Sequence, residues 1–370
     1  MWIENPALSP LPAPVWFVLF FKVLGFVLHM VLMNLWMVGL PLALLLHWKG
    51  CPQGKLWGTR LIRQMPVIIT FGVNFGIVPL LFIQLLYPRA FYPATILMAW
   101  HWIGIIALLI PAYYGTYLYV YAMAKEGTGI ASWQRACGWI SAIFFLIIGF
   151  FFVNGMVLTA SPESWKEVWL ARESSGATLG LGSAIRHATL FPRWVLMFGL
   201  ALGTLSAWTL WDRTFFLGNQ MPDYQKWSNG WTRMTAFFGA ILFTLAGSHY
   251  IFVTLSPELR HAMFAMPLLP WTLFAAVMPW ATAITVTWAT SRRSRAFPAA
   301  VVVLAQLAAL SANAISRQRL QILELNGFLP LSEIPVHTEL GPMLLFLGTF
   351  VVGVAVILWM LYQAILSRES

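Results

Sequence analysis

Histidine is the residue type in this chain best suited to hold a haem or a metal ion, and the chain has only seven copies of it. His29 lies in the middle of a long apolar run, and His101, His187 and His249 lie near the ends of later runs. A neutral imidazole is the usual axial ligand of haem iron. An ionisable side chain inside a membrane span also indicates a functional site by default. His29 is therefore a ligand candidate, whereas a histidine at a helix end can equally be an interfacial hydrogen-bonding residue.

Other residues with usable chemistry are less distinctive. His261 and His337 fall in connections between apolar runs, where a solvated histidine is the simpler interpretation. The sixteen methionines mainly predict packing between helices, although Met263, Met266 and Met278 each offer a thioether ligand. Tyr113, Tyr117 and Tyr121 form a stripe at helical spacing, which favours an interfacial aromatic belt over a redox relay.

The elements that must position these residues are membrane helices. Hydrophobic residues make up 60% of the chain and charged residues 9%, against about 25% charged residues in a soluble domain. The apolar runs are continuous and near the roughly 20 residues that cross a bilayer, which excludes an alternating β-barrel pattern. We therefore predict an all-α, polytopic membrane bundle, formed as a single domain over 1–370. It has about nine transmembrane helices, at 16–48, 66–87, 94–124, 137–160, 188–211, 234–256, 268–290, 297–316 and 340–365.

The charged residues of the connections predict an orientation. With the N-terminus outside, thirteen Lys and Arg residues fall on the inner side and eight on the outer side, as the positive-inside rule requires. The C-terminus is then cytoplasmic, and the membrane is the inner (plasma) membrane of a bacterium or archaeon. The net charge of +10 is explained by inner connections that face anionic membrane lipid. It does not call for a nucleic-acid partner.

Several kinds of cofactor site are excluded by the sequence. The chain has two cysteines, Cys51 and Cys137, both predicted on the inner side, where a structural disulfide is not expected. It contains neither the CxxCH motif of covalent haem attachment nor a cysteine set for an iron–sulfur cluster. It also has no Gly-rich nucleotide loop.

Four segments together resemble the large, haem-bearing subunit of cytochrome bd-type quinol oxidases. The first helix, FKVLGFVLHMVLMNLWMVGLPLALLLHW, is similar to the opening helix of that family, and FGVNFGIVPLLFIQ is similar to its FGINF-type segment. The stretch FFVNGMVLTASPESW, followed by SAIRHATLFPRWVLMFGLALGTLSAW, resembles the outer connection that leads to the low-spin haem histidine. Ser316-Arg317-Gln318 resembles part of the family's G-R-Q-P-W signature. The resemblance covers 16 to about 320.

The resemblance implies haem b and a set of residues to hold it. It places His187 on the low-spin haem ligand, His29 on the N-terminal ligand of the oxygen-reacting haem pair, and Arg317 on the arginine that pairs with haem propionates. The family's axial methionine corresponds by position to Met263, with His261 as the alternative. Arg186 and Arg193 lie at the same predicted depth, so they either neutralise propionates or extend to the outer interface.

Departures from the family change the expected function. No Asp or Glu occurs in the predicted second, third and eighth helices, and Ala314 replaces a ligand glutamate. The quinol-binding loop has shrunk to about LSPELRHAMFAMP. We therefore expect a haem b electron-transfer subunit of a respiratory complex, in contact with membrane lipid and other membrane subunits. It would pass electrons between quinol and a c-type cytochrome on the outer face. The alternatives are a bd-type terminal oxidase that reduces oxygen and a haem-free structural anchor.

Overall fold

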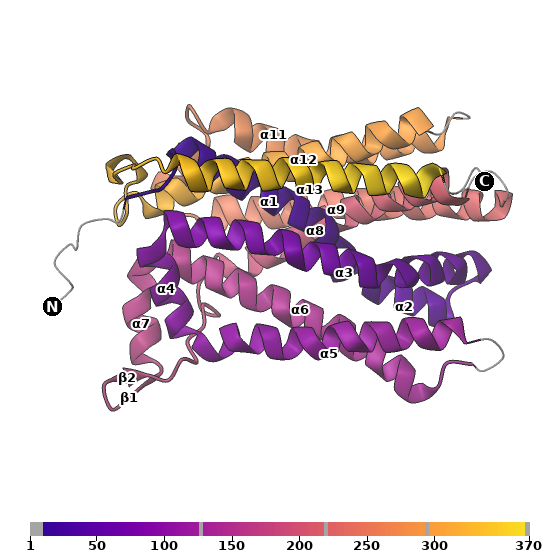
Figure 1. The fold of residues 1–370 in the computed structure, drawn as a ribbon, viewed down its shortest axis with the longest axis horizontal. Helices are drawn as coiled ribbons and strands as arrows, with labels where there is room; N and C mark the ends of the chain where they lie inside the picture. The colour runs from indigo at the N-terminus through magenta and orange to yellow at the C-terminus, as the bar shows by residue number, and fades with distance from the viewer. Residues whose placement is uncertain (1–9, 126–128, 218–220, 293–295, 367–370) are drawn as a thin grey trace.

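The structure is a computed structural model that describes residues 10–125, 129–217, 221–292 and 296–366. Helices make up nearly all of this part of the chain, which confirms the expected all-α membrane bundle (Figure 1). A short hairpin of β1 (Glu173–Ser174) and β2 (Ala177–Thr178) is the exception. The α-helices are α1 (Val15–Asn34), α2 (Leu40–Lys49), α3 (Pro52–Leu86), α4 (Pro88–Leu97), α5 (Ala99–Ala124), α6 (Ser132–Ala160), α7 (Trp165–Leu170), α8 (Leu190–Asp212), α9 (Pro222–His249), α10 (Pro257–Met263), α11 (Leu269–Thr290), α12 (Ala296–Leu325) and α13 (Leu340–Leu366).

Eight helical segments of the described chain are long and apolar enough to cross a membrane, and they correspond to eight of the nine expected spans. For α13, the apolar part that can be assessed is Leu340–Val356, which is shorter than a full crossing. The ninth crossing therefore stays a prediction. The orientation also stays a prediction, and three of the arginines that support it, at 293, 295 and 368, lie outside the described residues.

Several helix boundaries differ from those expected. The second membrane helix begins at Pro52 instead of 66, and the sixth begins at Pro222 instead of 234. The eighth continues to Leu325 instead of 316. The third expected span is divided into α4 and α5 at Met98, where the backbone leaves the helical conformation. Hydropathy locates the part of a helix that is immersed in hydrocarbon, whereas backbone hydrogen bonds continue the helix beyond it. The eighth helix as folded therefore contains an acid, Glu324, contrary to expectation.

The long first span is two α-helices joined by a π-helical turn. α1 ends at Asn34, the π turn covers Leu35–Gly39, and α2 follows. The π turn places Trp36 over Gly72 of α3, where an added Cβ atom would lie 2.2 Å from Cζ3 of the tryptophan ring. A π turn inserts one residue into the helical repeat and so rotates the side chains that follow about the helix axis.

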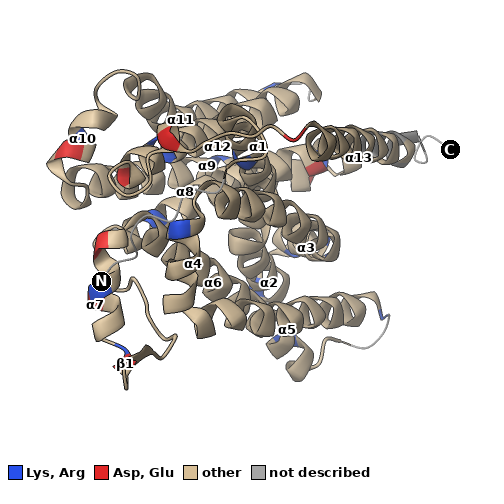
Figure 2. Ribbon diagram, turned by 60° about the vertical axis from the view of Figure 1, so that its left-hand side comes forward, with Lys and Arg blue, Asp and Glu red and all other residues tan. Residues whose placement is uncertain are grey.

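The bundle has two distinct ends. One end, called the α7 end, carries α4, α7, the β1–β2 hairpin and α10, and the opposite end carries α2 (Figure 1). Acidic residues mark α7 and α10 at the α7 end, while most of the bundle between the ends is uncharged (Figure 2). Two backbone hydrogen bonds at this end, Leu11 N to Pro335 O and His337 N to Leu11 O, fasten the start of the chain to the connection before α13.

A buried polar network fixes α3 to α8 near the α2 end. Arg60 donates two hydrogen bonds to the Asp212 carboxylate, at 2.8 and 2.9 Å. Gln64 donates a third at 2.7 Å, and its own carbonyl oxygen accepts from the indole of Trp208. Burying a carboxylate is costly unless it is paired and hydrogen-bonded, as Asp212 is here. The network therefore serves the packing of the helices.

A second buried network joins three helices at mid-height. Asn34 of α1 and Gln306 of α12 both donate to the Thr204 hydroxyl of α8, at 2.8 and 3.0 Å. All three side chains are almost completely buried. Because interhelical hydrogen bonds of this kind help to hold membrane helices together, they fix the relative positions of α1, α8 and α12. These helices contribute to the cavity described next.

Candidate functional site

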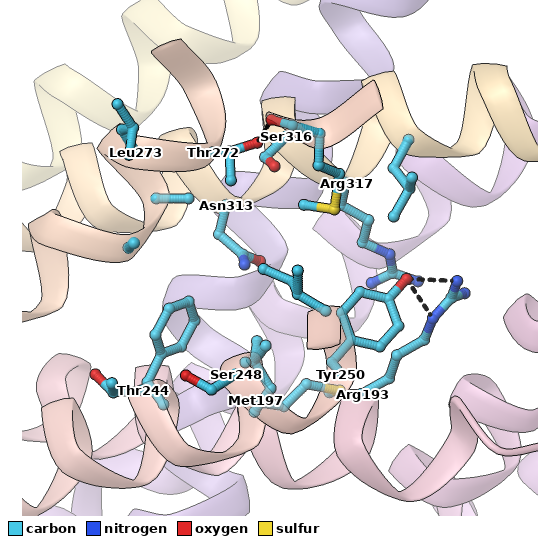
Figure 3. Close-up of a pocket in the computed structure, with 18 of the residues that line it drawn as sticks. Arg193, Met197, Thr244, Ser248, Tyr250, Thr272, Leu273, Asn313, Ser316 and Arg317 are labelled. Carbon is cyan, nitrogen blue, oxygen red and sulfur yellow. Dashed lines mark hydrogen bonds between the residues drawn. The ribbon is translucent and has the colours of Figure 1, made fainter. Parts of the chain in front are cut away.

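A cavity of about 360 Å³ lies between α8, α9, α11 and α12, in the half of the bundle nearer the α7 end. Its walls are mainly apolar and aromatic, and α1 contributes to them with Phe26 and Met30. A few polar groups converge on it, namely Arg193, Tyr250, Ser248, Thr272, Asn313, Ser316 and Arg317 (Figure 3). A mostly apolar cavity of this size with a few placed polar groups is typical of small-molecule and cofactor sites.

One of the two cavity arginines is neutralised by the protein. Arg193 donates to the Tyr250 hydroxyl from Nε and Nη2, at 3.1 and 2.8 Å. It also forms an ion pair with Glu324 of α12. The side chains of Arg193 and Glu324 are only 16% and 10% exposed. Arg193 therefore links α8 to α9 and α12 and adds little net charge to the cavity.

The other cavity arginine has no direct ion-pair partner among the described residues. The Arg317 guanidinium lies 5.3 Å from the ring centroid of Phe26 and forms no hydrogen bond or ion pair with any residue that the structure describes. Figure 3 shows its head group near Tyr250, whose hydroxyl accepts from Arg193 instead. A guanidinium binds carboxylate and phosphate groups in a bidentate manner. The cavity thus offers a site for an anionic group of a ligand.

Met263 lies in the wall of this cavity. It is 5% exposed and packs in a buried cluster with Tyr250, Leu255 and Leu320. Its carbonyl oxygen accepts a hydrogen bond of 2.9 Å from the Thr272 hydroxyl, which ties α10 to α11. His261, the alternative axial ligand, has an exposed side chain and is not among the cavity residues. The geometry therefore favours Met263 of the two.

His187 sits beside the cavity, in the segment that leads into α8. Asn154 of α6 positions this segment, because its Oδ1 accepts from the Ser183 hydroxyl and from the Ala184 backbone N–H. Nδ1 of His187 lies 2.9 Å from the buried Thr189 hydroxyl. The Thr189 backbone N–H also donates to Nδ1 at 3.4 Å. In that contact Nδ1 carries the lone pair, so a ligand role for Nε2 requires the other tautomer, in which Nδ1 donates to the Thr189 hydroxyl.

The surroundings of His187 favour its neutral form. Burial lowers its pKa below the usual value, the nearby Arg193 guanidinium lowers it further, and Glu163 partly opposes both effects. Only a neutral imidazole can ligate a metal. His187 is half-buried and does not line the cavity itself. Its role as a haem ligand stays a prediction.

His29 faces α3 and not the cavity. Its Nδ1 lies 2.7 Å from the Gly72 carbonyl oxygen, and Gly76 leaves room for its ring, because a Cβ atom there would lie 2.8 Å from Nδ1. A carbonyl oxygen only accepts, so Nδ1 carries the proton and Nε2 is free. His29 therefore has the tautomer of a ligand, but Phe26 and Met30 are the α1 residues that reach the cavity.

The predicted residues are thus brought together only in part. Met263, Arg193 and Arg317 line one cavity, and His187 lies next to Arg193. Arg186 and His261 are exposed and His29 is on another face of α1. Sequence reasoning missed Tyr250, Asn313 and Glu324. The sequence contained one signal for Glu324. It lies seven residues after Arg317, at helical spacing, and Gly327, which would stop the helix, comes only after it.

The lining of the cavity can be compared with the needs of a haem. The apolar walls match the macrocycle of a haem. The Met263 thioether matches a ligand of its iron, and the Arg317 guanidinium matches a propionate. Ala314, at the position where the family resemblance predicts a ligand glutamate, has no donor atom and is 4% exposed, packed in the core. Among the described residues, no group of three or more His, Cys, Asp or Glu residues could hold a bare metal ion. Haem iron needs only one or two such ligands.

Comparison with known proteins identifies the fold. None of the protein-family models matches the sequence, and no curated protein matches it either. A chain in the structure of bd oxidase from Geobacillus thermodenitrificans is similar, with a TM-score of 0.69 and 12% sequence identity, over 98% of this chain and 100% of that chain. This is the bd oxidase fold. The expected resemblance to bd-type oxidases is confirmed at the level of the fold, and the eight helices long and apolar enough to cross a membrane agree with a multi-pass membrane protein.

Proposed function

We propose that this protein is a haem b subunit of a respiratory electron-transfer complex, with one haem in the cavity at the α7 end. The observation that carries the proposal is that Met263 and Arg317 line the same apolar cavity in a chain with the bd oxidase fold. Arg317 has no ion-pair partner among the described residues. Both residues were expected at such a site from the sequence. The protein is a single membrane domain with the N-terminus outside, which puts this cavity near the outer surface.

Each residue has a distinct task in this proposal. His187 and Met263 would hold the haem iron, and Thr189 contacts Nδ1 of the His187 ring. Arg317 would bind a propionate, while Arg193 positions Tyr250 and the end of α9. The aromatic side chains in the cavity wall exclude water, which strengthens the interactions of charged groups inside. When bound, the haem supplies a centre that accepts and releases one electron.

The short connection between α9 and α11 bears on the proposed electron donor and acceptor. In this chain the connection consists of α10 and a few turns, which leaves little chain to enclose a substrate. We propose that membrane quinol approaches from the bilayer and that a c-type cytochrome docks at the α7 end. Other membrane subunits complete the complex.

A haem-free structural subunit is the second candidate. The observation in its favour is that no histidine is among the cavity residues, while Glu324 already neutralises Arg193. A chain with this fold could serve such a complex through packing alone. The haem content of the purified protein distinguishes the two.

We expect no oxygen reduction by this subunit alone, because the chemistry of that reaction consumes protons. α3 and α5 contain no Asp or Glu, and Glu324 of α12 is held in an ion pair. Buried carboxylates are the usual relay for protons inside a membrane protein. Oxygen uptake with a reduced quinol analogue should stay at background. Sustained, cyanide-sensitive turnover at about 10 per second, a typical enzyme rate, would favour the terminal oxidase.

Replacement of His187 tests the proposed ligand set. His187→Ala should abolish the low-spin visible spectrum of the reduced protein, because the iron loses one axial ligand, while the protein still inserts in the membrane. His337→Ala is the matched control, since His337 is an exposed histidine in the connection before α13. An unchanged spectrum in His187→Ala would show that another residue ligates the haem.

A further inference from the structure

A lysine is buried between α1 and α12, outside the cavity. Lys22 lies on α1, one helical turn before Phe26, and is only 7% exposed. Its ammonium donates to Oε1 of Gln318 at 2.6 Å and to Oε1 of Gln321 at 2.7 Å, both on α12. The ring centroid of Tyr87, at the end of α3, lies 5.2 Å from the ammonium nitrogen. Lys22, Tyr87 and Gln318 are called here the Lys22 site.

The charge of Lys22 is not balanced by a carboxylate of the described chain. Lys22 belongs to neither of the ion pairs that the structure describes, and both of its acceptors are neutral amides. Its electrostatic neighbour is Arg317, the residue before Gln318, which is a second cation and repels it. Because an unbalanced ammonium is costly to bury, the site calls for a negative charge.

Two further donors of the site have no acceptor. Tyr87 is completely buried and Gln318 is 8% exposed. Neither the Tyr87 hydroxyl nor Nε2 of Gln318 has a hydrogen-bond partner among the described residues. An ammonium only donates, so Oε1 of Gln318 must face Lys22, and Nε2 is left to donate elsewhere. Buried donors are nearly always satisfied in native proteins, so an acceptor that is not part of the described chain is expected here.

The two side chains cannot satisfy each other completely. Tyr87 lies beside the Gln318 side chain, and a hydrogen bond from Nε2 to the hydroxyl would occupy the Gln318 donor. The tyrosine proton would still have no acceptor. Two of the three ammonium protons of Lys22 are used by the glutamines, so the third is also available. The site therefore offers donors from three side chains and no acceptor for them.

We propose that Lys22, Tyr87 and Gln318 bind one small monovalent anion of about the size of chloride. An anion accepts from all three donors and balances the ammonium, and hydrogen bonds that involve an ion are the strong ones. A buried water molecule would also accept hydrogen bonds, but it brings no charge. The nearly complete burial of the three side chains leaves no room for a large anion.

The Lys22 site is separate from the proposed haem site. Lys22 is not among the residues that line the cavity. It lies seven residues after the start of α1 at Val15, which is about 10 Å along the helix axis, and Tyr87 directly follows the last residue of α3. The site is thus near the α7 end of the bundle, close to water that contains anions. The inference does not rest on the proposed function.

Thermal unfolding of the purified chain in detergent tests the site with bromide as the probe. Sodium bromide is compared with sodium gluconate at equal ionic strength, so that screening is the same in both. The unfolding temperature should rise in bromide by roughly 2 °C or more and then saturate, because a bound ligand stabilises the folded state. Lys22→Met should abolish this rise. Tyr92→Phe is the matched control and should keep it, since Tyr92 is an exposed tyrosine that donates to Gln84.

A native protein that does not respond to bromide would overturn the proposal, and so would an equal response in Lys22→Met. Tyr87→Phe keeps the buried ring and removes one donor. It should raise the bromide concentration for half-maximal stabilisation about tenfold or more, as expected for the loss of a hydrogen bond to a charged group. An unchanged bromide concentration in Tyr87→Phe would contradict the assigned geometry.

Bromide scatters X-rays anomalously, which locates it directly. Crystals grown in bromide should show an anomalous peak between Nζ of Lys22, the Tyr87 hydroxyl and Nε2 of Gln318. Density without an anomalous signal at this position would identify a water molecule and overturn the proposal. A bromide response confined to haem-free protein would mean that a haem carboxylate occupies the site, which would also overturn it.

Discussion

A Glu324→Leu variant should lose about 3–5 kcal/mol of unfolding free energy, the typical cost of removing one partner of a buried ion pair. In the native protein the Glu324 carboxylate neutralises Arg193, and both side chains are almost entirely buried. The variant leaves a guanidinium in an apolar cavity wall with only the Tyr250 hydroxyl as its acceptor. The measurement is thermal or denaturant unfolding of the purified protein in detergent.

The double variant Arg193→Met/Glu324→Leu is the control for this prediction. It removes both charges and keeps most of the packing volume, so it should recover most of the lost stability. Equal stability of Glu324→Leu and the native protein would mean that the ion pair does not form in the membrane. A double variant less stable than Glu324→Leu would show that Arg193 has a further partner.

Gly72→Ala should also destabilise the protein, by about 1–3 kcal/mol or more, the usual cost of overpacking a core. The new Cβ atom would lie 2.2 and 2.5 Å from two atoms of the Trp36 ring. That ring cannot retreat easily, because Trp36 is 6% exposed and packs against Phe145 at 5.6 Å between ring centroids. The unfolding temperature should fall clearly below that of the native protein.

Gly104→Ala provides a matched control on α5. Its new Cβ atom would meet Phe151 at 3.6 Å, an ordinary van der Waals contact. Replacing glycine by alanine inside a helix is otherwise favourable by about 0.5–1 kcal/mol. Gly104→Ala should therefore be neutral or stabilising. Two variants with the same stability would contradict the close approach of α1 and α3.

The helices could be predicted from the sequence far better than their ends. Length and apolar composition decide whether a helix crosses the bilayer, and eight crossings follow from them directly. Hydropathy does not detect the parts of a helix that extend beyond the hydrocarbon. The first turns of α3 and the last turns of α12 were therefore missed. The π turn at Leu35–Gly39 has no signal in composition, since it depends on the packing of Trp36 against α3.

Site residues could be predicted only where a family motif or their position along the chain identified them. Met263 and Arg317 were expected through family resemblance, and the structure places both in the cavity. Tyr250 and Glu324 depend on contacts between residues far apart in the chain, which periodicity does not report. His29 was identified as a ligand candidate by its depth, but the rotation of α1 that turns it towards Gly72 could not be read from the sequence.

The haem content of the purified protein tests the central claim most directly. A pyridine haemochrome assay, with the reduced-minus-oxidised spectrum of the same sample, measures haem type and number together. The proposed function predicts about one protohaem per chain, with a low-spin spectrum, because one cavity combines Met263 and Arg317 while Ala314 provides no ligand for a second haem. A protein purified intact from its native membranes that contains no haem would contradict the claim and leave the haem-free structural subunit.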